Sequence, residues 1–427
     1  MSGSTEEKKS RSTDASRVSS GQILKALEDK DTNVILEDPL ENYMVLNMGP
    51  QHPATHGVLR LLIKLDGETV VECVPELGYL HRGYEKIAES CTYHEFIPHT
   101  DRLDYISPLA NNVGYALAVE SIAGVEAPPR AQYIRVVAAE LARISSHLMA
   151  IGAMAMDVGA MTVFLWSFRE REKLYDVFDL LTGVRFTTSY TRIGGVAQDM
   201  TDETRNAISR FIDDFPKHLA EMGKMLNRNR IFLDRTVGVG PIDAKAAIEI
   251  GFSGANLRAS GVEHDLRTSS PYLVYDNLSF EVITEKGGDC FSRYMVRMRE
   301  MTESTKLVRQ ALEKMPHGPV KAELPKKVLP DKEPVYTRME ELIHDFVIVN
   351  DGVHPDPGDS YTAIEGSKGE LGFYIISDGS GHPWRLKIRS PSFCNLQALP
   401  LLLKGQMISD VVAIVGSIDP IMGEADK

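Results

Sequence analysis

The stretch RAQYIRVVAAELARISSHLMAIGAMA at 130–155, with MTVFLWSFREREKLYDVFDLL at 161–181, decides the fold of this chain. The first segment is a continuous run of good helix formers without proline, and the second has an amphipathic helical pattern. Similar patterns recur at 202–229 and 289–315. Long antiparallel helices bury their apolar faces against one another, so these segments predict a helical bundle.

Two β-hairpins are predicted on either side of this bundle. In the first, VLRLLIKL at 58–65 and TVVECV at 69–74 flank Asp66-Gly67, a pair that suits a two-residue turn with positive φ. In the second, 372–377 and 384–389 flank the turn-forming sequence DGSGHP, and an apolar helix and strand are expected at 396–416. We therefore predict an α+β fold with a central long-helix bundle, an N-terminal antiparallel sheet and a C-terminal β-hairpin region.

The composition along the chain divides it into five parts. Residues 1–35 are expected to form a flexible extension with a short helix at 22–28, because the first 20 or so residues are rich in Ser, Glu and Lys. The other four parts are an antiparallel β region (36–78), the helical bundle core (79–315), a Pro/Lys-rich connector (316–335) and a C-terminal α+β region packed on the core (336–427).

Composition also narrows the classes of function. The chain has 427 residues, 43% of them hydrophobic, which suffices for a large core. A formal net charge of -13 argues against a nucleic-acid partner, since phosphate binding needs a basic surface. The first residues lack the apolar core of a signal peptide, and no stretch approaches the roughly 20 apolar residues that span a bilayer. We therefore expect a cytoplasmic chain unless a partner takes it elsewhere.

The four cysteines, at 73, 91, 290 and 394, are far apart and form no C-x-x-C motif. They predict reduced thiols rather than a disulfide framework or a cluster site. The chain also lacks G-x-G-x-x-G and G-x-x-x-x-G-K-[ST], which disfavours nucleotide binding.

The loop GPQHPATHG at 49–57 places His52 and His56 between prolines and glycines, just before a predicted strand. Pro50 and Pro53 restrict the backbone, so the two imidazoles lose little freedom when they engage a ligand. A lone loop of this kind is more often a turn that satisfies its own hydrogen bonds.

A second motif, HTDRLDYIS at 99–107, brings Arg102, Asp104 and Tyr105 together before a predicted helix. A phenol there is protonated at neutral pH and can donate a hydrogen bond or a proton to an oxygen-bearing ligand. A capping aspartate beside a tyrosine half in the core explains the segment as well. Asp157 lies in the apolar segment AIGAMAMDVGAM and needs a cationic or hydrogen-bonding neighbour to stay ionised.

The helix through Glu140, Arg143 and His147 places these three side chains on one face. A carboxylate, a guanidinium and an imidazole stacked in this way are able to satisfy one another when they are buried. Most such triplets are structural.

Taken together, these motifs resemble one family, the 49 kDa subunit of respiratory complex I, which is the large hydrophilic D subunit of NADH-quinone oxidoreductase. The resemblance covers nearly everything from 43 to 427. Its motifs are GPQHPATHG (49–57), GYLHRGYEK (78–86), RLDY (102–105), PPRAQYIRV (128–136), RIGGV (192–196), LRASGV (257–262), IEGSKGELGFYIISDG (364–379) and DPIMGEADK (419–427).

That family is in turn similar to the large subunit of nickel-iron hydrogenases, which bind their metals through R-x-C-x-x-C and D-P-C-x-x-C. The matching positions here are RLDYIS at 102–107 and DPIMGE at 419–424, and all four thiolates are missing. A nickel-iron centre needs soft thiolate ligands, so we expect neither nickel nor an iron-sulfur cluster in this chain. A functioning hydrogenase is disfavoured for the same reason.

The resemblance assigns the emptied pocket to a quinone headgroup, at an interface with a smaller iron-sulfur subunit whose cluster supplies the electrons. Quinone reduction consumes two protons, so the site needs donors aimed at the two carbonyl oxygens. The family's pattern gives these roles to Tyr105 and His56, with Asp157 paired to His56. It also places His52 and Asp104 at the pocket or the neighbouring cluster, and Arg82 and Arg102 near the cluster.

The implied partners are the small iron-sulfur subunit, the 30 kDa-type subunit and the quinone-channel subunit of the membrane arm, with NADH and FMN bound elsewhere in the complex. The implied location is the cytoplasmic side of the inner membrane, where the complex translocates protons. Many relatives carry a histidine where this chain has Thr187. Ubiquinone and menaquinone both fit, and two alternatives stay open: a complex fed by ferredoxin or a deazaflavin, and a non-catalytic scaffold.

Overall fold

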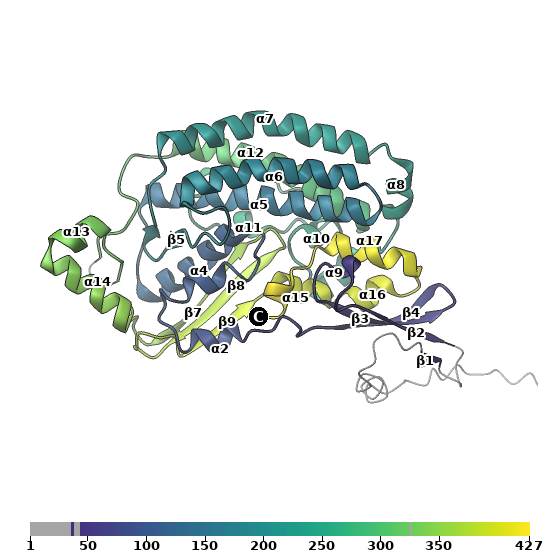
Figure 1. Ribbon diagram of the computed structural model, residues 1–427, viewed down its shortest axis with the longest axis horizontal. Helices are drawn as coiled ribbons and strands as arrows, with labels where there is room; N and C mark the ends of the chain where they lie inside the picture. Colours follow the sequence, from purple (N-terminus) through teal and green to yellow (C-terminus); the bar gives the residue numbers. More distant parts are fainter. Residues whose placement is uncertain (1–35, 38–42, 325–326) are drawn as a thin grey trace, which may run out of the picture.

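Four long helices form the predicted bundle in a computed structural model, which describes residues 36–37, 43–324 and 327–427 (Figure 1). They are α5 (Pro129–Asp157), α6 (Met161–Thr182), α7 (Asp202–Leu226) and α12 (Cys290–Lys314). Helices α5 and α7 each contact both α6 and α12. The predictions for 1–35, including the helix at 22–28, lie outside the described residues.

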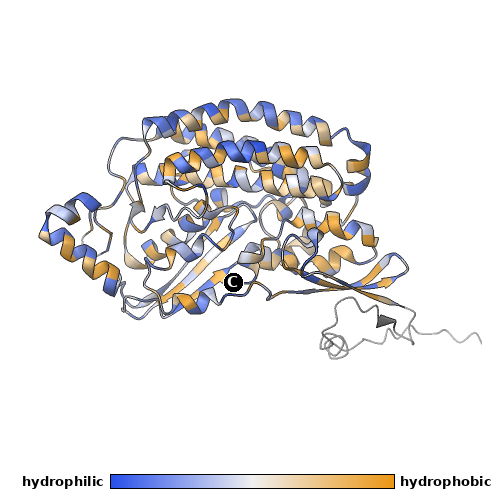
Figure 2. Ribbon diagram, viewed as in Figure 1, coloured by the Kyte–Doolittle hydropathy of each residue, from blue (hydrophilic) through white to orange (hydrophobic). Residues whose placement is uncertain are grey.

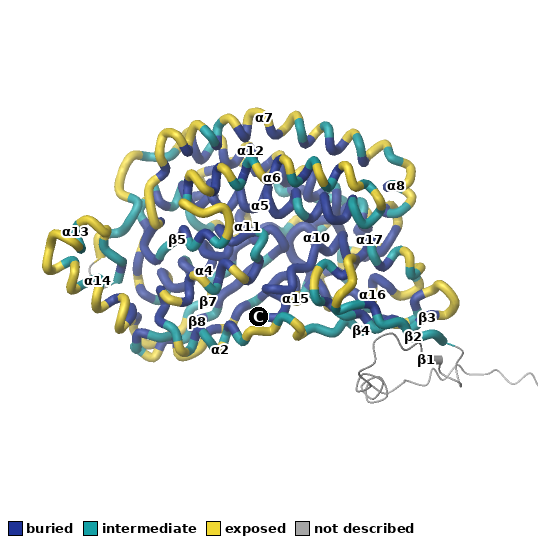
Figure 3. Tube along the Cα trace, viewed as in Figure 1, coloured by how far each residue is buried: buried dark blue, intermediate teal, exposed yellow. Residues whose placement is uncertain are grey.

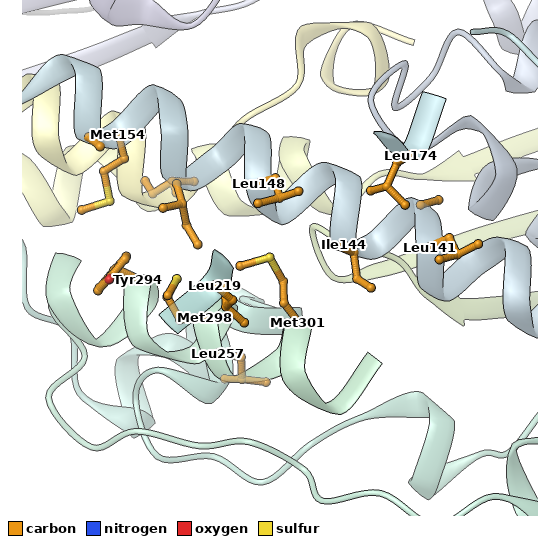
Figure 4. Packing of buried hydrophobic residues seen from close by; sticks show 14 of the residues in the cluster. Leu141, Ile144, Leu148, Met154, Leu174, Leu219, Leu257, Tyr294, Met298 and Met301 are labelled. Carbon is orange, nitrogen blue, oxygen red and sulfur yellow. The ribbon is translucent and has the colours of Figure 1, made fainter. Parts of the chain in front are cut away.

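Helix α5 lies at the centre of the bundle and α7 on its outside (Figure 3). In α7 the buried side chains recur at helical spacing, as at Phe211, Phe215 and Leu219, while its outer face is hydrophilic (Figure 2). Figure 4 shows the core between α5 and α12, where Leu148 and Met301 are both fully buried. Burying one such side chain stabilises the fold by about 1.5–3 kcal/mol.

Helix α5 is also long and apolar enough to cross a membrane, judged by length and composition alone. However, 94% of its most apolar window is buried inside the protein. Its apolar surface is therefore already covered by the other helices, as expected for the core helix of a globular fold.

The N-terminal sheet consists of β1 (Leu36–Glu37), β2 (Met44–Met48), β3 (Arg60–Asp66) and β4 (Thr69–Glu76), all antiparallel and in that order. Side chains of β3 alternate between buried and partly exposed, so one face packs on the core. The predicted hairpin is confirmed, but Asp66 pairs with Thr69. The two-residue turn is therefore Gly67-Glu68, with Gly67 at a φ of 60°, rather than Asp66-Gly67.

The second predicted hairpin is also confirmed, as β8 (Glu370–Ser377) and β9 (Arg385–Arg389). An additional strand that we did not predict, β7 (Gly358–Glu365), extends it to a three-stranded antiparallel sheet. Helix α4 (Pro108–Ala123) packs on β7 and β8, and the ring of Tyr115 meets that of Phe373 edge-on at 5.7 Å. The turn between β7 and β8 carries part of the candidate site.

The C-terminal segment differs from the prediction. The expected helix and strand at 396–416 are instead two helices, α16 (Leu399–Leu403) and α17 (Ile408–Ile418). The run Val411-Val412-Ala413-Ile414-Val415 is apolar throughout, and such a run is compatible with a buried strand or a buried helix. Here it packs as a helix against α5 and α12, which decides between the two.

The predicted connector at 316–335 ends in a helix that we did not expect. Helix α13 (Lys332–Thr337) begins inside it, and α14 (Met339–Asp351) follows directly (Figure 1). The remaining elements are η1 (Pro53–Thr55), α2 (Tyr84–Ala88), α3 (Ile97–Thr100), β5 (Thr191–Arg192), β6 (Gly195–Val196), α8 (Arg230–Thr236), α9 (Ala244–Ile250), α10 (Gly254–Arg258), α11 (Leu266–Ser269), η2 (Tyr275–Asn277), α15 (Pro391–Leu396) and α18 (Met422–Ala425).

Candidate functional site

The loop 49–57 joins β2 to β3 and carries both histidines of the first motif. The hydroxyl of Thr55 holds the loop closed, because it donates to the carbonyl oxygens of His52 (2.8 Å) and Gly57 (3.0 Å). His56 has a left-handed φ of 52°, which side-chain-bearing residues seldom adopt. A methyl group at Gly57 would lie 3.1 Å from Cγ of Met422, so α18 packs directly on this loop.

His56 and Asp157 lie in contact, although 101 residues separate them in the sequence. Nε2 of His56 is 2.6 Å from Oδ2 of Asp157, the last residue of α5, and the two side chains are 12% and 6% exposed. Gly416 of α17 lies beside the pair, since a methyl group there would be 3.1 Å from Oδ2 and 3.4 Å from Nε2. The carboxylate thus fixes the orientation of the imidazole.

Tyr105 lies in the turn between α3 and α4, and this turn is tightly fixed. The side-chain amide of Asn111 donates to the backbone carbonyls of Thr100 (3.0 Å) and Asp104 (2.9 Å), and Oδ1 of Asp104 accepts from the backbone N–H of Ile106 (3.1 Å). Tyr105 itself is partly exposed, and in the described part of the chain its hydroxyl makes no hydrogen bond. The phenol is therefore available to a ligand.

Gly423 brings α18 against the Tyr105 turn. A methyl group at Gly423 would lie 2.5 Å from the carbonyl oxygen of Leu103, 2.7 Å from that of Arg102 and 3.1 Å from Cδ1 of Tyr105. Met422 packs on the loop that bears His56 and Gly423 packs on the turn that bears Tyr105, so the same short helix contacts both segments.

We expect Gly423→Ala to destabilise the protein and to displace Tyr105, because the two carbonyl oxygens belong to backbone that cannot easily move. Overpacking of this kind costs about 1–3 kcal/mol, measured as a loss in the free energy of unfolding in urea. Gly358→Ala is the matched control, since a methyl group there meets nothing within 4 Å. Equal stability of the two variants would show that the α18 contact is looser than described.

Three carboxyl groups are buried behind Tyr105. Asp104 accepts a hydrogen bond from Ser367 (3.1 Å), Asp419 pairs with the ammonium of Lys368, and Glu424 accepts from both the backbone N–H (3.0 Å) and the hydroxyl of Ser392. The three carboxyl groups and Lys368 carry charge when ionised. These four side chains and the two serines are all at least nine-tenths buried. Buried charges need partners, so the protonation states here are coupled.

Burial is the main cause of the pKa shifts in this cluster. Burial and repulsion from Asp104 raise the pKa of Glu424 to about 8, although the hydrogen bonds from Ser392 and the charge of Lys368 oppose this. Burial also raises the pKa of Asp104, with repulsion from Asp419 adding to the effect and Lys368 opposing it. The pKa of the Tyr105 phenol is raised by burial and by Asp104, Asp419 and Glu424, against the opposing charge of Arg82.

The remaining predicted site residues lie on the surface. The guanidinium of Arg82 donates to the hydroxyl of Tyr84 (3.0 Å), and that of Arg102 donates to the carbonyl of Pro98 (2.5 Å). Both arginines and His52 are exposed, and Arg82 acts on Tyr105 electrostatically. Thr187 is partly exposed, in a left-handed conformation with a φ of 54°. The roles assigned to Arg82, Arg102 and His52 stay predictions.

The face of α5 that carries Glu140, Arg143 and His147 is occupied by structural contacts. Glu140 pairs with Arg143 (3.2 Å) and Arg267 (3.1 Å). His147 does not join this group, because its Nε2 lies 2.8 Å from Glu300 of α12. Burial, with nearby Arg297 and Arg143, lowers the pKa of His147 to about 4, against the pull of Glu300. The predicted triplet is thus a pair and a separate histidine.

Sequence reasoning gave no role to Lys368 or Glu424. Both lie in quoted motifs, and Glu424 occupies the last thiolate position of the hydrogenase pattern, as Asp104 occupies the first thiolate position of the other. The presence of a carboxyl residue at a position where hydrogenases have a metal-binding cysteine was the signal that could have pointed to Glu424. Within the described ranges no three His, Cys, Asp or Glu side chains are grouped to hold a metal ion.

The structure thus presents an imidazole held by a carboxylate, a phenol without a hydrogen-bond partner in the described residues, and a cluster of buried carboxyl groups. The family model for the respiratory-chain NADH dehydrogenase 49 kDa subunit matches residues 157–427, more than half of the chain. The chain belongs to this family.

Close relatives support the assignment, and each is named as the D subunit of an NADH-quinone oxidoreductase. The relative from Chloroherpeton thalassium is 58% identical, over 97% of this chain and 95% of its own length. That from Salinibacter ruber is 52% identical over 91% of this chain and 87% of its own length. The protein of Methylacidiphilum infernorum is 55% identical, with coverage of 90% and 92%. These alignments span His56 and Tyr105 as well as the matched C-terminal part.

Proposed function

We propose that this chain is the subunit of a proton-translocating NADH:quinone oxidoreductase that forms the quinone-reduction pocket. The observation that carries the proposal is the 2.6 Å contact between His56 and Asp157, together with a Tyr105 hydroxyl that makes no hydrogen bond in the described residues. Family membership supports the same activity. The competing view of a non-catalytic scaffold gives no reason for this pair and this phenol to stay together.

In the proposed reaction, a quinone accepts two electrons from an iron-sulfur cluster in the small iron-sulfur partner. The Tyr105 hydroxyl protonates one carbonyl oxygen of the quinone and the His56 imidazolium protonates the other, which yields the quinol. Asp157 keeps the imidazole oriented for the transfer through its contact with Nε2. Arg82 and Arg102 add positive charge on the side of the cluster, which favours its reduced, more negative state.

The proposed assembly also contains the 30 kDa-type subunit and the quinone-channel subunit of the membrane arm, with NADH and FMN bound elsewhere in the complex. One surface feature supports a role inside a larger complex. Helix α14, which carries hydrophobic segments in Figure 2, exposes Leu342 (52%), Ile343 (53%) and Phe346 (66%). Large exposed apolar patches are rare on free-standing soluble proteins. We place the chain peripherally, on the cytoplasmic side of the inner membrane.

A photoreactive quinone analogue tests the proposal on the purified, assembled complex. We expect light-dependent labelling of this chain within 49–57 or 102–107, because these segments bear the two proton donors. An excess of the unreactive quinone should suppress the labelling, as mass spectrometry of the digested chain will show. Labelling confined to other subunits would refute a pocket in this chain.

A further inference from the structure

Three buried carboxyl groups near Tyr105 share one lysine. Lys368 is in direct contact with Asp419 and is itself 3% exposed, so its charge balances that carboxylate. Asp104 and Glu424 then have only hydroxyl and backbone donors as partners, from Ser367, Ile106 and Ser392. Two uncompensated carboxylates buried at one place repel each other, and such a pair retains a proton.

We propose that Asp104 and Glu424 together hold one proton that returns to Tyr105 after each quinone reduction. The inference rests on the proposed function, since it assumes that Tyr105 gives its proton to quinone. Glu424 acts through Tyr105 and does not itself touch quinone. It follows Gly423, the residue of α18 that lies against the Tyr105 ring, and its charge acts on the phenol.

The proton transfer balances without any further reactant. When Tyr105 gives its proton to the quinone oxygen, the phenolate is left beside a protonated carboxyl. The carboxyl O–H bond breaks, the phenol O–H bond forms again, and the carboxylate later recovers a proton from water. The transfer is favourable because the pKa of Glu424 is about 8 and that of Tyr105 is raised above 10.

The other charged groups around the pair do not supply this proton. Lys427 donates to the carbonyl of Ile388, Arg171 donates to the hydroxyl of Tyr175 (2.6 Å), and Arg297 donates to the carbonyl of Ser417 (2.7 Å). Each of these cations has its own acceptor. Arg82 is exposed and reaches Tyr105 only electrostatically, so it stabilises the phenolate without delivering a proton. Asp419 is neutralised by Lys368.

Glu424→Gln in the assembled complex tests the inference. A glutamine keeps the shape and still accepts from Ser392, but it cannot release a proton. We expect the turnover number for quinone to fall about tenfold or more at neutral pH, since the phenolate is re-protonated more slowly. We also expect the wild type to lose activity as the pH rises through about 8, and this loss to be absent from the profile of Glu424→Gln.

Ser392→Ala provides the second variant, because it removes a hydrogen bond to Glu424 and keeps the carboxyl group. The bond from the Ser392 hydroxyl lowers the pKa of Glu424, so its loss should raise that pKa and move the loss of activity at alkaline pH to higher pH. A purely structural role for Glu424 would lower the turnover number without shifting the pH at which activity is lost. If that pH is the same as in the wild type for both variants, the inference is wrong.

The outcome separates this inference from the proposed function. If only the inference fails, the quinone analogue still labels the loop 49–57 or the turn 102–107 while Glu424→Gln shows the wild-type pH profile. If the proposed function fails, the labelling is lost as well. NADH oxidation with ferricyanide as acceptor, which bypasses the quinone site, should be unchanged in both variants and reports on an intact assembly.

Discussion

We expect Tyr105→Phe to lower quinone turnover by about 10²- to 10⁴-fold, the contribution of one positioned proton donor. The variant keeps the aromatic ring that packs beside Gly423 and loses only the hydroxyl, so the fold should not change. In the described residues that hydroxyl has no hydrogen-bond partner to leave unsatisfied. The turnover number and KM for a water-soluble quinone are measured on the assembled complex, with the loss expected mainly in the turnover number.

The control for this variant is Tyr361→Phe, on the exposed β7 strand. Tyr361 is 52% exposed and its hydroxyl donates to Glu370 (2.8 Å), so its loss should leave quinone turnover at the wild-type level. Electron delivery from NADH to ferricyanide should also persist in Tyr105→Phe. Full quinone reductase activity in Tyr105→Phe would remove the phenol from the mechanism.

The helices of the bundle were predictable because their signal is local. In α7, apolar residues recur at helical spacing and Thr201 caps the first turn, accepting from the N–H of Thr204 (3.2 Å). The hairpins β3–β4 and β8–β9 carry their own turn residues in the same way. By contrast, the apolar run in α17 has no such local marker, and only its packing against α5 and α12 makes it a helix.

Only those residues of the candidate site that stand in recognisable sequence motifs were predictable. His56, Tyr105 and Asp157 stand in specific sequence motifs, whereas the reason for their proximity lies in α18 and Gly416, far along the chain. The pKa of Glu424 depends on burial and on Asp104, and neither can be read from the neighbours of Glu424 in sequence. Long-range charge pairing is likewise invisible, as the contact of His147 with Glu300 of α12 shows.

Glu140→Gln should produce the largest loss of stability among the single substitutions considered, about 3–5 kcal/mol in the free energy of unfolding. The carboxylate of Glu140 is fully buried and pairs with Arg143 and Arg267. It also accepts from the hydroxyls of Tyr275 (2.7 Å) and Ser304 (2.7 Å). Glutamine leaves two buried guanidiniums without their shared negative charge, and burying uncompensated charge is costly.

The matched control is Glu249→Gln, in the exposed pair with Lys245, where the lysine and glutamate side chains are 84% and 66% exposed and 3.8 Å apart. Surface pairs contribute about 0–1 kcal/mol, so this variant should unfold in urea almost as the wild type does. If Glu140→Gln and Glu249→Gln both show only this small loss in the free energy of unfolding, the buried network does not stabilise the fold.

The pH dependence of the Glu140 effect has a definite sign. Burial raises the pKa of Glu140. The charges of Arg143 and Arg267 and the two hydroxyl donors outweigh this effect and lower the pKa to about 2. Because the folded-state pKa lies below the unfolded value of about 4.3, the ionised carboxylate stabilises the protein above that value. The stability difference between the wild type and Glu140→Gln should therefore shrink as the pH falls from about 4.3 toward about 2.

This substitution also reaches the quinone site, because Arg143 links the bundle to the turn between β7 and β8. Its guanidinium donates to the carbonyls of Glu365 (2.6 Å) and Gly366 (3.0 Å), at the start of the turn that carries Lys368. Releasing Arg143 from Glu140 loosens that anchor, and Lys368 then pairs less firmly with Asp419. We accordingly expect Glu140→Gln to lower quinone turnover under conditions where the variant is still folded, a loss that Glu249→Gln should not share.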